Sequence, residues 1–243
     1  MSDQITAIIP VSALPSHPST EVLDVTIDSI RTRLPDSEII IMFDYPTATL
    51  MEYKAAYERF KQSMLWKINF MENVVPLVFD EPSHQSLMFK KALELVRTPL
   101  ILWGEQDTPL HGKIPFDELI PVIENGYANV IRFHFEATIP EAHNHLMLDQ
   151  KPIDILGQPF IRTRQWSGRP HLASTKYYRE IVSKYFDDKP RFIEHIMYGI
   201  VAETHNDFDE HRVHIYAPDG SLVRSKHLDG RRYGAEHYDP ATS

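Results

Sequence analysis

The first 107 residues alternate between short apolar runs and segments with helical spacing, and this alternation constrains the fold more than any other feature. The apolar runs are rich in Ile, Val and Leu and have the length of buried strands. Between them, apolar residues recur every three or four positions, as on one face of an amphipathic helix. This succession predicts βαβ units, a mostly parallel central sheet and helices on both faces. The expected strands cover 5–11, 38–44, 73–79 and 99–103, and the expected helices cover 22–34, 50–64 and 87–96.

The second half of the chain has a less regular pattern. It contains no internal repeat, low-complexity stretch or clear linker, which predicts one domain. Residue character alternates along 129–135 as it does in a strand, and 153–164 is expected to be a strand pair or a loop rich in turns. Thr175 is the expected cap of one helix and Pro190 the expected start of another. Residues 213–226 predict a hairpin with its turn at 218–221.

Composition excludes several classes of protein. The 243 residues contain no cysteine, so disulfide frameworks, thiolate zinc sites and cysteine nucleophiles are ruled out. A formal charge of −9 argues against a general nucleic-acid binder but leaves room for local basic patches. The sequence has only 9 glycines and neither a G-x-G-x-x-G nor a Walker motif. The chain begins without a signal-peptide pattern and lacks an apolar run long enough for a membrane span, so we expect a cytoplasmic protein.

Carboxylates follow two of the expected strands. Asp44 ends the second, and Glu105 and Asp107 come directly after the fourth. In parallel sheets, ligands bind beyond the carboxyl ends of the strands, which predicts two acidic sites on one edge. Glu105 and Asp107 offer oxygen ligands suited to Mg²⁺ or Mn²⁺ with a diphosphate, or they form a solvated acidic turn. Asp44 is expected to accept a hydrogen bond from a ribose hydroxyl or a base edge, or only to form the turn before Tyr45.

Three segments of the second half also carry residues that could take part in binding or catalysis. The loop at 165–171 combines an aromatic, a cation and an imidazole, although it also fits a connecting loop around a packed tryptophan. Glu194 lies in the helix after Pro190 and is a candidate general base, or a surface glutamate in a salt bridge. The segment at 224–232 places His227 among arginines and a lysine. There the histidine could bind a metal or a phosphate, or the whole segment is a solvated basic tail. The 13 histidines have irregular spacings, so we do not expect a dedicated zinc site.

Together these segments resemble a GT-A-type, nucleotide-sugar-dependent glycosyltransferase of the family-2-like kind. Residues 6–11 resemble the first strand of that fold, whose end meets the nucleotide. Residues 100–107 resemble the strand and D-x-D motif that hold the metal and the sugar diphosphate, with Glu105 in place of the first aspartate. Asp44 resembles the family's carboxylate for the uracil or ribose, and Glu194 resembles its catalytic base. His227 resembles its late metal-binding histidine.

The resemblance implies an α/β, GT-A-like (Rossmann-like) single domain over 1–243. Its 1–110 half would bind the nucleotide-sugar and its 111–243 half the acceptor. It also implies metal-assisted transfer from a UDP- or GDP-type donor, inverting with Glu194 as base, with Mn²⁺ or Mg²⁺ on Asp107 and His227. The donor-binding residues that follow are Pro10, Val11, Asp44, Lys90, Glu105, Gln106, Asp107 and Arg231, and the acceptor-binding residues are Trp166, Arg169 and His171.

The acceptor and the reaction class leave alternatives open. The acceptor hydroxyl belongs to a glycan or to a modified base in DNA, because Trp166 could stack on a sugar ring or on a nucleobase. A nucleotidyltransferase shares the sheet and the carboxylates, but residues 11–16 lack its glycine- and lysine-rich first loop. A non-catalytic carbohydrate- or nucleotide-binding protein is a second rival, and a metal hydrolase would need several histidines to converge. The basic strip that could follow a phosphodiester backbone comprises Arg162, Arg164, Arg169, Arg224, Lys226, Arg231 and Arg232.

Overall fold

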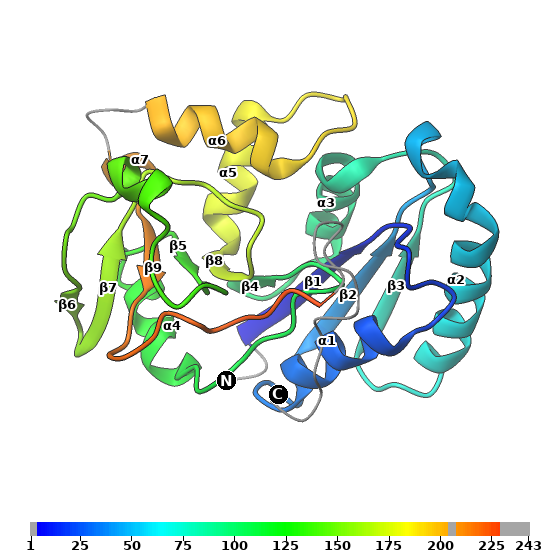
Figure 1. Cartoon of the computed structure of the whole chain (residues 1–243), viewed down its shortest axis with the longest axis horizontal. Helices are drawn as coiled ribbons and strands as arrows, with labels where there is room; N and C mark the ends of the chain where they lie inside the picture. The colour runs from blue at the N-terminus through cyan, green and yellow to red at the C-terminus, as the bar shows by residue number, and fades with distance from the viewer. Residues whose placement is uncertain (1–3, 204–207, 229–243) are drawn as a thin grey trace.

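A computed structural model describes residues 4–203 and 208–228 of the chain. Its centre is a nine-stranded sheet in the order β3-β2-β1-β4-β8-β5-β9-β7-β6 (Figure 1). Among these strands only β7 and β8 run against the others, so the sheet is mostly parallel. The strands are β1 (Ile5–Val11), β2 (Glu38–Phe43), β3 (Val74–Val78), β4 (Leu100–Trp103), β5 (Val130–Arg132), β6 (Ile153–Ile155), β7 (Gln158–Arg162), β8 (His171–Ser174) and β9 (Val213–Tyr216).

Helices cover both faces of the sheet, because successive side chains of the central strands point to opposite sides. In β1, Ile5, Ala7 and Ile9 pack in one apolar cluster with α1, α2 and α4, whereas Ile8 packs in the other with α3, α5 and α6. Figure 1 shows α5 and α6 above the sheet and α4 below it. The helices are α1 (Glu21–Arg31), α2 (Lys54–Ile68), α3 (His84–Leu95), α4 (Phe116–Glu124), α5 (Thr175–Tyr185), α6 (Ile193–Glu203) and α7 (Phe208–His211), with 3-10 helices at Ala48–Tyr53 and Glu141–Leu146.

The expected alternation of the first half is confirmed. β1 to β4 and α1 to α3 overlap the predicted ranges, although α2 begins after a 3-10 helix and ends beyond the expected range. Residues 153–164 contain the antiparallel pair of β6 and β7. The cap of α5 lies one residue before the expected Thr175. The Ser174 hydroxyl accepts from the Tyr177 N–H at the start of α5, while the Thr175 hydroxyl donates to the carbonyl of Thr98.

The prediction of a hairpin over 213–226 is wrong. β9 is its only strand, and both of its edges are already taken, by β5 on one side and β7 on the other. The chain after the turn therefore cannot fold back on β9. It runs instead to bridges between Val223 and His134 and between Ser225 and Leu110. This path brings His227 to the segment after β4, beside Asp107.

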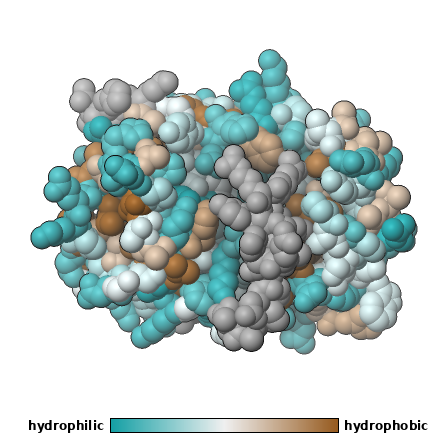
Figure 2. All heavy atoms as spheres, viewed as in Figure 1, coloured by the Kyte–Doolittle hydropathy of each residue, from teal (hydrophilic) through white to brown (hydrophobic). Residues whose placement is uncertain are grey.

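One face of the molecule is mostly polar. In the view of Figure 2, polar side chains dominate and apolar ones form small separate patches. Within residues 4–203 and 208–228, no helix has the length and apolar character needed to cross a bilayer.

Candidate functional site

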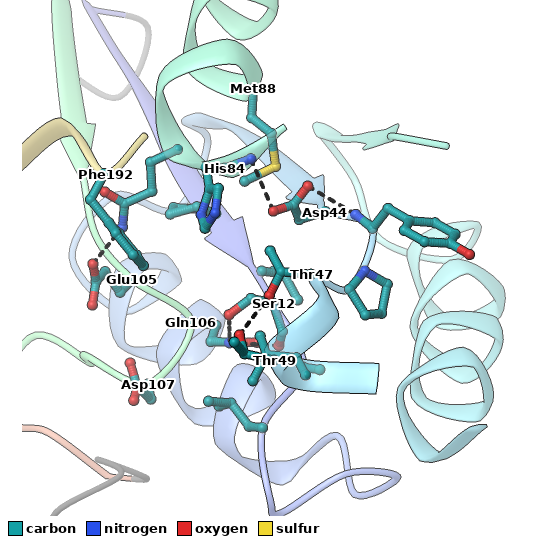
Figure 3. A pocket seen from close by; sticks show the side chains of 18 of the residues that line it. Ser12, Asp44, Thr47, Thr49, His84, Met88, Glu105, Gln106, Asp107 and Phe192 are labelled. Carbon is teal, nitrogen blue, oxygen red and sulfur yellow. Dashed lines mark hydrogen bonds between the residues drawn. The ribbon is translucent and has the colours of Figure 1, made fainter. Parts of the chain in front are cut away.

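A cavity of about 290 Å³ lies beyond the carboxyl ends of β1, β2 and β4. The predicted donor residues Pro10, Val11, Asp44, Glu105, Gln106 and Asp107 all line it. Figure 3 shows Asp44 on one side and Glu105 and Asp107 on the other, so the two acidic sites expected on one sheet edge share a single hollow. The rest of the wall comes from Ser12, Ala13, Leu14, Tyr45, Pro46, Thr47, Thr49, Leu50, His84, Gln85, Met88, Phe192 and His227.

Asp44 anchors the amino terminus of α3. Its Oδ1 accepts the N–H groups of Ser83 at 2.8 Å and Tyr45 at 2.9 Å, and its Oδ2 accepts the N–H of His84 at 3.1 Å. His84 itself has a left-handed φ of 49°, an uncommon conformation for a residue other than glycine. Burial raises the pKa of Asp44, and the three amides oppose that rise without cancelling it. Asp44 therefore shapes the cavity wall through α3, besides facing any ligand in the cavity.

The Glu105–Gln106–Asp107 segment is held firmly at the end of β4. The Glu105 N–H donates to the Thr108 hydroxyl at 2.8 Å, and the Gln106 amide donates to the Ser12 carbonyl at 2.9 Å. Thr26 of α1 donates to the Gln106 carbonyl at 2.8 Å. Glu105 and Asp107 face the cavity while Gln106 ties the segment to the end of β1. A motif held in this way meets a ligand with little reorganisation.

Asp107 and His227 come together although they are far apart in the sequence. The His227 Nε2 lies 3.5 Å from the Asp107 Oδ2, and the Leu228 N–H donates to the Asp107 carbonyl at 2.9 Å. A carboxylate oxygen and an imidazole nitrogen side by side suit a divalent ion that completes its coordination with phosphate oxygens. Among the described residues, three or more metal-ligating side chains are nowhere grouped together. The pair therefore fits an ion shared with a ligand better than one held by the protein alone.

Glu194 approaches Glu105 across Gly168. The Gly168 N–H donates to the Glu194 Oε2 at 3.2 Å. A Cβ placed on Gly168 would lie 3.2 Å from the Glu105 Oε1 and 3.3 Å from the Glu194 Oε2. The two carboxylates thus face one small space beside a residue that has no side chain. The Gly168 N–H thus holds one oxygen of the Glu194 carboxylate, Oε2, in place.

Basic side chains lie close to Glu194. Arg132 at the end of β5 is 1% exposed and donates through Nη1 to the Gln165 carbonyl at 2.7 Å. Its Nε and Nη2 have no hydrogen-bond partner in the described part of the chain. Burial, and then the charge of Arg169, lower the pKa of Arg132 to about 9, while Glu194 and Glu136 favour its charged form. Arg169 stacks on Phe135, whose ring lies 6.1 Å from that of His227.

Other predicted site residues lie away from the cavity. Trp166 is 2% exposed and packs against His171 and Tyr178, so its ring faces are occupied by the core. His171 is bonded to the Tyr178 hydroxyl, and burial lowers its pKa to about 4. Lys90 turns from the cavity and pairs with Asp188 at 2.9 Å. Arg231, like Arg232 of the expected basic strip, lies outside the described residues.

Sequence reasoning missed several residues that shape this site. Gln85 donates to Glu105, Gly168 separates the two glutamates, and Phe192 lines the cavity. The sequence shows Arg132 only as part of an alternating strand. An arginine in the middle of an expected strand is its one sequence signal, because arginine is almost never fully buried without a partner. The others carry no local sequence signature.

A scan against protein-family models finds no matching family, and a search among curated proteins finds no relative. Among solved structures, the chain is similar to S. aureus TarS 1-349 in complex with UDP-GlcNAc, with a TM-score of 0.59, 8% identity, and coverage of 97% of this chain and 61% of that one. GalNAc-T7 with UDP, GalNAc and Mn²⁺ has a TM-score of 0.58 at 9% identity, over 92% of this chain and 43% of that one. The mannosyltransferase PcManGT from Pyrobaculum calidifontis, in complex with GDP-Man and Mn²⁺, has a TM-score of 0.55 at 12% identity, over 95% and 58%.

These likenesses concern the fold, because the identities are low and the chain spans about 60% of the TarS structure that it matches. The mostly parallel sheet, the helices on both faces and the cavity beyond β1, β2 and β4 agree with them. The chain therefore has the GT-A fold of nucleotide-sugar-dependent glycosyltransferases.

Proposed function

We propose that the chain is a metal-assisted glycosyltransferase that moves a sugar from a UDP- or GDP-type nucleotide-sugar to an acceptor hydroxyl. The observation that carries this proposal is the pair of Asp107 and His227, 3.5 Å apart on the wall of the cavity. The fold neighbours support the donor class, since their structures hold UDP-GlcNAc, UDP or GDP-Man, two of them with Mn²⁺.

Asp107 and His227 would hold Mn²⁺ or Mg²⁺. When bound, the ion supplies positive charge that offsets the negative charge of the leaving nucleoside diphosphate. Residues after β1 and β2 would bind the nucleoside, with Asp44 and the α3 terminus forming one wall. Gln106 keeps the acidic segment fixed against the end of β1.

Glu194 would act as the base of an inverting transfer. Its Oε2 is fixed by the Gly168 N–H, and its Oε1 would take the proton of the acceptor hydroxyl. The positive charges of Arg132 and Arg169 lie near this carboxylate. The acceptor is a glycan or a modified base in DNA. Arg162 is already paired with Asp149 at 2.7 Å and Arg169 with Glu136, so part of the expected basic strip is neutralised.

A binding screen tests the donor half of the proposal. UDP, GDP, UDP-GlcNAc and GDP-mannose are added with and without Mn²⁺, and thermal stability and heats of binding are measured. A ligand at a hundredfold excess over its dissociation constant stabilises the folded chain by about 2.7 kcal/mol. We expect stabilisation that needs Mn²⁺ and is lost in Asp107→Ala. Binding that is indifferent to both the ion and Asp107 would contradict the metal assignment.

Turnover tests the base. Glu194→Gln should retain donor binding but lose about 10²–10⁴-fold in kcat, the usual contribution of a general base. Sugar release to water serves as the assay until an acceptor is found. Full turnover in a folded Glu194→Gln variant would remove Glu194 from the mechanism. A gel shift with DNA at low salt separates the two acceptor classes, since no binding there excludes the modified-base alternative.

A further inference from the structure

Gln85 joins Glu105 to the residue directly before Glu194 by a hydrogen bond at each end of its side-chain amide. It is the second residue of α3 and is 7% exposed. Its Nε2 donates to the Glu105 Oε1 at 2.7 Å, and its Oε1 accepts the N–H of Ile193 at 3.3 Å. Ile193 is the first residue of α6, directly before Glu194. One side-chain amide therefore joins the segment after β4 to the helix that carries Glu194.

Each end of the amide meets a need of its partner. The first N–H groups of a helix have no partner inside the helix, and Gln85 supplies one for Ile193 from another element. Glu105 is a partly buried carboxylate, which requires a donor. Only one orientation of the amide places its NH₂ on the carboxylate and its oxygen on the N–H. Gln85 is thus held in a single pose.

The pose of Gln85 is in turn set from the other wall of the cavity. Asp44 accepts the N–H groups of Ser83 and His84, the residues directly before Gln85. A continuous path of hydrogen bonds and backbone then leads from Asp44 through Gln85 to the start of α6. On its far side, Glu194 is held again by the Gly168 N–H at 3.2 Å.

We propose that Gln85 is a positioning residue that fixes the start of α6, and with it Glu194, against Glu105. The catalytic part of this inference rests on the transferase function proposed above. Without Gln85, Glu105 loses one hydrogen bond and the first N–H of α6 loses its side-chain acceptor. Glu194 then keeps the Gly168 hydrogen bond, but the start of its helix is no longer tied to Glu105, and its carboxylate samples positions away from the acceptor hydroxyl.

Amide hydrogen exchange tests the placement without any assay of activity. Gln85→Leu removes both bonds at nearly constant size, and Gln85→Glu puts a second carboxylate against Glu105, which breaks that bond and adds like-charge repulsion. Ser86→Ala is the matched control, because the Ser86 hydroxyl ties α3 to the same segment by accepting from Arg191 N–H and donating to the Lys189 carbonyl. Losing one net hydrogen bond corresponds to roughly a three- to tenfold faster exchange. We expect this at Ile193 in both Gln85 variants, and near-normal exchange there in Ser86→Ala.

Turnover with Mn²⁺ and UDP-GlcNAc or GDP-mannose tests the consequence. We expect both Gln85 variants to lose about tenfold in kcat, with KM for the donor changed by less than about threefold, because each breaks the bond to Glu105. Ser86→Ala should keep the wild-type kcat. Unchanged exchange at Ile193 in folded Gln85→Leu would overturn the inference, as would an equal loss of kcat in Ser86→Ala. If the wild-type chain turns over no nucleotide-sugar, the proposed function fails, while the exchange result still decides the placement.

Discussion

Gly168→Ala places a methyl group between two carboxylates and so tests how closely the site is packed. The new Cβ would lie 3.2 Å from the Glu105 Oε1 and 3.3 Å from the Glu194 Oε2, against an ordinary contact of 3.4 Å or more. Both are ends of side chains, so they can yield by a few tenths of an ångström. A shift of 1 Å in a catalytic group costs roughly a hundredfold in rate, and a few tenths scale to roughly a three- to tenfold loss of kcat.

The fold should tolerate this change. Gly168 is not among the glycines with a positive φ. Alanine lowers the conformational entropy of the unfolded chain, which stabilises the fold by about 0.4–1 kcal/mol and offsets part of the crowding. We therefore expect a melting temperature close to wild type together with reduced turnover of the Mn²⁺-bound nucleotide-sugar.

Gly104→Ala is the matched control at the same edge of the sheet. A Cβ there would meet only the Thr108 hydroxyl, at 3.8 Å, which is an ordinary contact. We expect this variant to keep wild-type turnover. If folded Gly168→Ala also keeps wild-type turnover, the two glutamates are not confined as the structure indicates, and the reasoning is refuted.

Two further predictions concern residues buried in the core. Burial lowers the pKa of both His171 and His214 to about 4, so the unfolded chain takes up protons below about 6.5 that the folded chain does not. Between pH 6.5 and 4 the free energy of unfolding should fall by up to about 1.4 kcal/mol per pH unit for each histidine. Urea titrations should show a shallower decline in His214→Gln, and an identical slope would contradict the assignment. Trp166→Ala should cost about 3–5 kcal/mol of stability, because a fully packed indole leaves a cavity. Trp166→Phe should fold and bind Mn²⁺ with UDP as wild type does. A loss of that affinity in the folded variant would instead indicate that Trp166 contacts the ligand.

Local pattern was enough to predict the first half of the fold. The runs at 5–11 and 38–44 are apolar without interruption, as strands covered on both faces must be, and the segments between them have helical spacing. The ends of these strands are therefore visible in the sequence. Because parallel strands end on one edge, the sequence also predicts that Asp44 and Asp107 face one cavity, and the structure places them there.

The centre of the sheet was much harder to predict. β8 is four residues long and runs antiparallel between β4 and β5, yet residues 171–174 carry no pattern that separates them from a loop. α4 contains Pro121, which hides its helical spacing. The expected hairpin after 213 failed for a related reason: whether a strand has a free edge depends on which strands have already paired with it.

The sequence by itself determined the strand–helix alternation, the two acidic strand ends and the candidates Glu194 and His227, because these features lie within short stretches of chain. Only the tertiary structure decided that His227 meets Asp107, that Gln85 and Gly168 set the approach of Glu194 to Glu105, and that Trp166 and His171 are core residues. The physical reason is that these relations join elements far apart in the chain. A side chain's partner and its access to solvent depend on the packing of all those elements together, which no local pattern records.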